Sequence, residues 1–126
     1  MSHTILLVED NENNRNLLKD ILDFHGYQVA MASDGQEALV LAQKLLPDLI
    51  LMDIQMPNMD GLTACKILKS DPTTSDLKIV ALTSFAMQGD PEKFLAAGFD
   101  AYISKPLNTR ELPLLMKQWL SSRETS

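Results

Sequence analysis

The sequence predicts an α/β protein in which a doubly wound, five-stranded parallel sheet, in the strand order 2-1-3-4-5, carries five helices. Short apolar runs alternate with segments of helical periodicity five times along the chain, which is typical of strands joined by crossover helices. The run Leu49–Met52 is apolar on both faces, as expected for a central strand that is covered by helices on both sides. A length of 126 residues suits a single domain.

Each strand is expected where an apolar run is bounded by polar or turn residues. The first, Ile-Leu-Leu-Val, lies between polar residues, and the third carries the continuous apolar run described above. The expected strands are, in chain order, Thr4–Glu9, Tyr27–Met31, Asp48–Asp53, Lys78–Thr83 and Asp100–Ile103.

The five helices are expected between and after these strands, with glycine or proline as stop signals. Ser33 and Gln36 form a plausible capping box for the second helix, and Asn108 and Glu111 are expected to cap the last. The expected bounds are Asn11–His25, Ser33 to Pro47, Leu62–Ser70, Glu92–Ala97 and a final helix after Asn108. The faces expected to be buried are Leu17, Leu18, Ile21 and Leu22 on the first helix, and Ala38, Leu39, Ala42 and Leu45 on the second.

Composition excludes several classes of function. The chain has 11 Lys+Arg against 17 Asp+Glu and a formal charge of -6, which disfavours binding to nucleic acid. It has no basic run for an anionic membrane surface, and its apolar stretches are too short to cross a bilayer. The first residues do not resemble a signal peptide, so we expect a cytoplasmic protein. Cys65 is the only cysteine, which excludes an intramolecular disulfide.

Polar residues follow the predicted strands at the edge where such folds bind ligands. In a sheet of this order, that place is beyond the carboxyl ends of strands one and three. Strand one ends in Glu9 and Asp10, and strand three ends in Asp53. Strand four ends in Thr83, and Lys105 follows strand five. Three acids, a hydroxyl and a lysine are therefore expected at one edge of the sheet.

Clustered carboxylates repel one another unless a cation compensates, and a pocket of oxygen ligands suits Mg²⁺. An ionised Asp53 is a competent nucleophile toward an activated phosphoryl group, whose charge Mg²⁺, Lys105 and the Thr83 hydroxyl would meet. A single acid at a strand end is more often a cap or turn residue, and Asp10 alone could start the first helix. The topology by itself therefore predicts only an acidic, metal-binding crevice.

Five short motifs lie at or near these strand ends: Val8–Asn11, Leu51–Pro57, Met59–Gly61, Ala81–Thr83 and Tyr102–Pro106. Together they resemble the receiver domain of two-component response regulators over essentially the whole chain. They are similar to stand-alone regulators of the DivK type, to CheY-like proteins with a flavodoxin-like fold, and to receiver domains of hybrid histidine kinases.

This resemblance implies a role for each residue at the edge. Asp53 would accept a phosphoryl group from a histidine kinase or histidine phosphotransferase, and Thr83 and Lys105 would bind it. Mg²⁺ would be held by the side chains of Asp10 and Asp53, by Glu9 and by a backbone carbonyl. Gln55 would supply that carbonyl, and Phe85 would lie at the rim of the site. The rotamer of Tyr102 would change together with the movement of Thr83. The Lys105-Pro106 bond is expected to be cis.

The resemblance also implies that residues 1–126 form one receiver domain with no output domain, which would act on a downstream protein through its fourth helix, fifth strand and fifth helix. A receiver domain excised from a hybrid kinase is the alternative. Two other classes of function are weighed. An aspartyl-phosphate phosphatase would require an acidic residue at the position of Gln55. A flavodoxin-like flavin carrier would want a phosphate-binding loop in place of the acids around Asp10.

Overall fold

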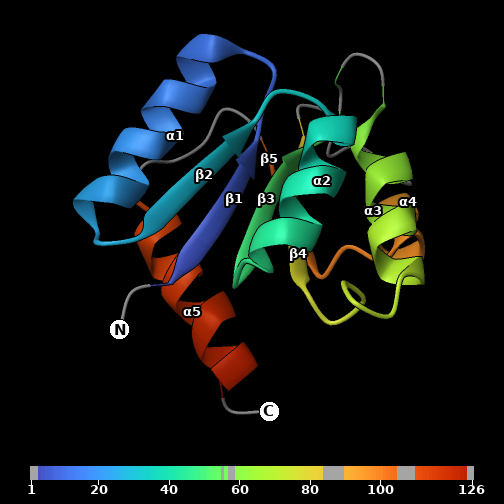
Figure 1. Ribbon diagram of the computed structural model, residues 1–126. Coiled ribbons are helices and arrows are strands. Elements are labelled where there is room, and N and C mark those ends of the chain that lie inside the picture. The colour runs from blue at the N-terminus through green and yellow to red at the C-terminus, as the bar shows by residue number, and fades with distance from the viewer. Residues whose placement is uncertain (1–2, 55, 57–58, 84–89, 105–109, 125–126) are drawn as a thin grey trace.

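A computed structural model describes residues 3–54, 56, 59–83, 90–104 and 110–124 of the chain (Figure 1). Five parallel strands form one sheet in the order β2-β1-β3-β4-β5, so the predicted fold class and strand order are confirmed. The strands are β1 (Thr4–Val8), β2 (Gln28–Ala32), β3 (Leu49–Asp53), β4 (Lys78–Thr83) and β5 (Ala101–Ser104). The helices are α1 (Glu12–Phe24), α2 (Gly35–Leu45), α3 (Gly61–Ser70), α4 (Asp90–Ala97) and α5 (Leu112–Glu124).

The helices cover the sheet from both sides and bury two separate apolar layers (Figure 1). Alternate strand residues face opposite layers, since successive side chains of a strand point to opposite faces. Ile5, Leu49 and Leu51 pack under α1 and α5, whereas Leu6, Ile50 and Met52 pack under α2, α3 and α4. Every residue of β3 is buried, as predicted for the central strand. No helix within the described ranges is both long enough and apolar enough to span a membrane.

Two residues expected in the core lie at the surface. Leu17 on α1 is 51% exposed and Leu45 on α2 is 40% exposed, whereas their neighbours Leu18 and Ala42 are buried. Both exposed residues lie at the border of the apolar face, where a helix of 3.6 residues per turn has already rotated the side chain toward solvent. The buried face of each helix is therefore narrower than its leucine pattern predicts.

The N-terminal cap of α2 also differs from the expected capping box. Asp34, not Ser33, is the capping residue, and its carboxylate accepts a hydrogen bond of 2.8 Å from the Glu37 backbone amide. The Ser33 hydroxyl instead donates to the Glu37 carboxylate at 3.2 Å. The polar residues Ser33, Asp34 and Gln36 are close in sequence, and only the backbone geometry decides which one caps the helix. The expected cap at Asn108 lies outside the described residues.

Lys69 of α3 binds the segments that lie just before β4 and just before β5. Its ammonium donates to the Leu77 carbonyl at 2.8 Å and to the Asp100 carboxylate at 3.2 Å. The same carboxylate accepts from the Ile79 amide at 2.9 Å. Near this lysine, burial raises the pKa of the Cys65 thiol to about 12, so Cys65 is a small core residue, as the sequence indicated.

Replacing Lys69 by methionine is expected to lower the free energy of unfolding by about 1–3 kcal/mol, because the buried Leu77 carbonyl and the Asp100 carboxylate lose a charged donor. Urea denaturation measures the change. Lys66→Met is the matched control, since Lys66 is an exposed lysine on the same helix. Equal unfolding midpoints for the two variants would contradict a fastening role for Lys69.

Candidate functional site

The sheet register places the ends of three neighbouring strands together. Val8 of β1 pairs with Met52 of β3, so Glu9 follows on directly beside Asp53. Asp53 in turn pairs with Leu82 of β4, which puts Thr83 one residue beyond Asp53 on the adjacent strand. The carboxyl ends of parallel strands lie at one edge of the sheet. In the order β2-β1-β3, strands β1 and β3 are neighbours at the point where the strand order reverses, which is where such folds bind ligands.

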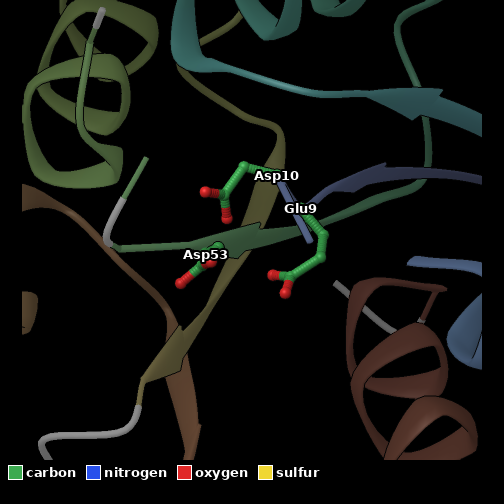
Figure 2. A group of neighbouring side chains, drawn as sticks. All are labelled: Glu9, Asp10 and Asp53. Carbon is green, nitrogen blue, oxygen red and sulfur yellow. The ribbon is translucent and has the colours of Figure 1, made fainter. Parts of the chain in front are cut away.

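Three carboxylates converge at this edge (Figure 2). Glu9 and Asp10 follow β1, Asp53 ends β3, and one oxygen from each side chain lies within 4.8 Å of the other two. The Glu9 side chain is fully buried and Asp53 is only 5% exposed, whereas Asp10 is exposed. Among the described residues, Asp10 therefore lies on the exposed side of the cluster, and Glu9 and Asp53 lie in the protein interior.

Asp10 does not serve as the helix cap that a lone acid after a strand would suggest. The cap of α1 is Asn11, whose side-chain oxygen accepts a hydrogen bond of 3.0 Å from the Asn14 backbone amide. Because Asn11 satisfies the helix end, the Asp10 carboxylate is left to face the other two acids. The alternative that Asp10 serves only as the cap of the first helix, which the sequence left open, is thus excluded.

The cluster has the ligand chemistry of a hard divalent cation. Two unit charges at this separation repel by about 3–4 kcal/mol at an effective dielectric constant of about 20, so a bound cation removes a large unfavourable term. All three donors are carboxylate oxygens, which Mg²⁺ prefers over nitrogen or sulfur ligands. The exposed side leaves room for the water molecules that Mg²⁺ retains in proteins. The residues therefore fit this ion.

Two residues of α1 hold Glu9 in place. The Asn14 side-chain amide donates to Glu9 Oε1 at 3.1 Å, and the Arg15 guanidinium donates to the Glu9 backbone carbonyl at 2.8 Å. The Glu9 amide donates to the Ala32 carbonyl of β2 at 3.1 Å. Sequence reasoning missed Asn14 and Arg15, because an asparagine and an arginine in the first turn of a helix carry no signal of what they contact across a loop.

The turn after β3 fixes the Asp53 backbone from the other side. The Ile54 amide donates to the Leu82 carbonyl at 3.1 Å, and the Ile54 carbonyl accepts from the Gly61 amide at 2.9 Å. Asp60 caps α3 by accepting a hydrogen bond of 2.8 Å from the Thr63 amide. A Cβ atom on Gly61 would lie 2.3 Å from the Asp53 carbonyl oxygen, so only glycine allows α3 to start this close to the acid.

Thr83 and Tyr102 lie on the two strands that follow. Thr83 is buried at the end of β4, next to Asp53 in the sheet. Tyr102 of β5 pairs with Ala81, two residues before Thr83, and its side chain is 40% exposed. The Tyr102 ring lies 5.9 Å from the ring of Phe94 on α4, measured between centroids. Tyr102 is thus partly exposed and lies beside Phe94 of α4.

Several site residues expected from the sequence lie outside the described part of the chain. These are Gln55, Phe85, Lys105 and Pro106, with the expected cis bond between the last two. Their roles remain predictions.

Comparison with known proteins identifies the family. The profile of the response regulator receiver domain matches residues 5–117, and the chain belongs to this family. The polar-differentiation response regulator DivK of Brucella ovis is 42% identical over 120 residues, which cover 95% of this chain and 98% of DivK.

Solved structures agree with this assignment. A CheY-like response regulator receiver domain protein from Methanospirillum hungatei superimposes with a TM-score of 0.91 at 31% identity, over 99% of this chain and 98% of that one. The receiver domain of a sensor histidine kinase from Pseudomonas aeruginosa superimposes with a TM-score of 0.89 at 36% identity, over 96% and 99% of the two chains. That crystal structure has a magnesium ion coordinated in its active site cleft.

Proposed function

We propose that the protein is a phosphorylation-controlled switch in which Asp53 accepts a phosphoryl group from a phosphohistidine of a histidine kinase or histidine phosphotransferase. A carboxylate oxygen of Asp53 forms the new O–P bond, while the P–N bond to the donor imidazole breaks and its electron pair stays on the imidazole nitrogen. The observation that carries this proposal is the nearly buried Asp53 carboxylate, aimed at two further acids at the carboxyl edge of a receiver-type sheet.

The residues around Asp53 divide the remaining work. Asp10 and Asp53 would hold Mg²⁺, with Glu9 beside them and the Gln55 backbone carbonyl as a further ligand. When bound, the ion supplies positive charge against the transferring phosphoryl oxygens. The Thr83 hydroxyl and the Lys105 ammonium are proposed to bind those oxygens once the group is on Asp53. Phe85 is a proposed rim residue that influences how readily water attacks the phosphorylated Asp53.

The output is proposed to leave through α4, β5 and α5. Phosphorylation adds a charged group with several acceptor oxygens, and it shifts the protein between two states only as far as these states bind the group differently. Thr83 and Tyr102 lie on adjacent strands, and Tyr102 contacts Phe94 of α4. A movement of Thr83 toward Asp53 would therefore change the position of the partly exposed Tyr102, because β4 and β5 are paired. A downstream protein would then bind the altered surface of α4, β5 and α5.

We further propose that the chain forms one receiver domain of the kind found in DivK. The match, which covers 98% of DivK, supports this proposal. The resemblance to the receiver domain of a sensor histidine kinase keeps an excised hybrid-kinase domain as the second candidate. The acids at the end of β1 argue against a flavin carrier, because they would repel the phosphate of the flavin.

Intact-mass spectrometry tests the proposal. After incubation with Mg²⁺ and a small phosphodonor, the wild-type protein is expected to gain the mass of one phosphoryl group. Asp53→Asn, which removes the nucleophile but keeps the side-chain shape, is expected to gain none, and a chelator should prevent labelling of the wild type. A wild-type protein that gains no group, even from a phosphorylated histidine phosphotransferase, would overturn the proposal.

A further inference from the structure

Asn14 connects the first turn of α1 to the acidic cluster. Its backbone amide donates to the side chain of the helix cap Asn11 at 3.0 Å, and its side-chain amide donates to Glu9 Oε1 at 3.1 Å. The main chain of Asn14 therefore lies at the capped end of α1, and its side chain reaches back to Glu9. Asn14 itself is exposed, whereas the carboxylate that it binds is fully buried.

The contact with Asn14 restricts the orientation of the Glu9 carboxylate. Its side chain has one more rotatable bond than an aspartate, so its carboxylate can adopt more positions unless a hydrogen bond selects one. The Glu9 backbone is already held by Arg15 and Ala32, so the contact from Asn14 acts on the carboxylate alone. In this arrangement of the side chain, oxygens of Glu9, Asp10 and Asp53 lie within 4.8 Å of one another.

We propose that Asn14 is a positioning residue for the metal site: it orients the Glu9 carboxylate toward Asp10 and Asp53 and thereby sets the affinity for Mg²⁺. This inference rests on the proposed binding of Mg²⁺ at the cluster. Groups that hold a metal ligand through a hydrogen bond typically change metal affinity by about 10- to 100-fold when they are removed. Asn14→Ala is therefore expected to raise the Kd for Mg²⁺ by about tenfold.

The matched control is Asn13→Ala. Asn13 is the preceding residue on the same exposed turn of α1, so both substitutions change helix propensity in the same direction. Magnesium titrations followed by amide chemical shifts give Kd for the wild type and each variant. Asn13→Ala is expected to bind like the wild type.

A double-mutant cycle with Glu9→Asp separates positioning from a general effect on the helix. The shorter aspartate cannot extend its carboxylate to the Asn14 amide, so Asn14→Ala should have no further effect on Kd in the Glu9→Asp background. An equal loss of affinity in both backgrounds would overturn the proposal, as would an unchanged Kd for Asn14→Ala alone. Failure of the wild type itself to bind Mg²⁺ would overturn both this inference and the proposed metal site.

Discussion

Gly61→Ala is expected to lower the free energy of unfolding by about 1–2 kcal/mol and to impair phosphoryl acceptance at Asp53. The new Cβ atom would lie 2.3 Å from the Asp53 carbonyl oxygen and 3.0 Å from the Ile54 Cα, and both contacts are with backbone that cannot simply rotate away. Overpacking of this kind typically costs about 1–3 kcal/mol and sometimes more. The cost outweighs the gain of up to about 1 kcal/mol that alanine brings to a helix.

Gly26→Ala is the control for this prediction. Gly26 has a φ of +88°, and no atom lies within 4 Å of the position that a Cβ would take there, so its substitution reports only the backbone conformation. Urea denaturation of both variants, with intact-mass phosphorylation of each, separates the two effects. Gly26→Ala should lose about 1 kcal/mol and keep normal phosphorylation. If Gly61→Ala also phosphorylates at the wild-type rate, the close approach of α3 does not position Asp53.

The fold could be predicted because its signals are repeated and mutually consistent. Five apolar runs alternating with helical periodicity indicate a parallel sheet, and the continuous apolar character of β3 places it at the centre. The predictions of buried residues were wrong where small local differences in energy decide whether a side chain is buried. Leu17 has the same side chain as the buried Leu18, and Leu45 is as apolar as the buried Ala42, so only the orientation of each helix against the sheet exposes Leu17 and Leu45. Tertiary packing, which periodicity does not contain, decides such border positions.

The acidic cluster could be predicted because topology alone brings strand ends together. Once β1 and β3 are neighbours, acids that end these strands must approach one another, whatever the loops do. The contacts of Asn14 and Arg15 with Glu9 could not be predicted in this way. They depend on how α1 leaves the strand and on which asparagine caps it, and the sequence Asn11-Glu12-Asn13-Asn14 offers three asparagines in a row of four.

Magnesium is expected to stabilise the wild-type protein through the acidic cluster. An ion that binds only the folded state raises the free energy of unfolding by about 2.7 kcal/mol when its concentration is about 100 times Kd. Asp10→Asn removes one of the three carboxylates and should abolish most of this gain. Without Mg²⁺, the same variant should be at least as stable as the wild type, because it relieves repulsion between like charges and Asn11, not Asp10, caps α1.

Urea denaturation with and without Mg²⁺ measures both effects, and Asp76→Asn is the control. Asp76 is an exposed acid just before β4, at the opposite edge of the sheet, so its variant should keep the full response to Mg²⁺ while losing the same formal charge as Asp10→Asn. The comparison isolates position from charge. A general effect of ionic strength would act alike on the two variants, whereas an ion held by Glu9, Asp10 and Asp53 distinguishes them. Equal stabilisation of Asp10→Asn and Asp76→Asn by Mg²⁺ would therefore show that the ion binds away from the cluster. The proposed role of Mg²⁺ in phosphoryl transfer to Asp53 would then lose its support.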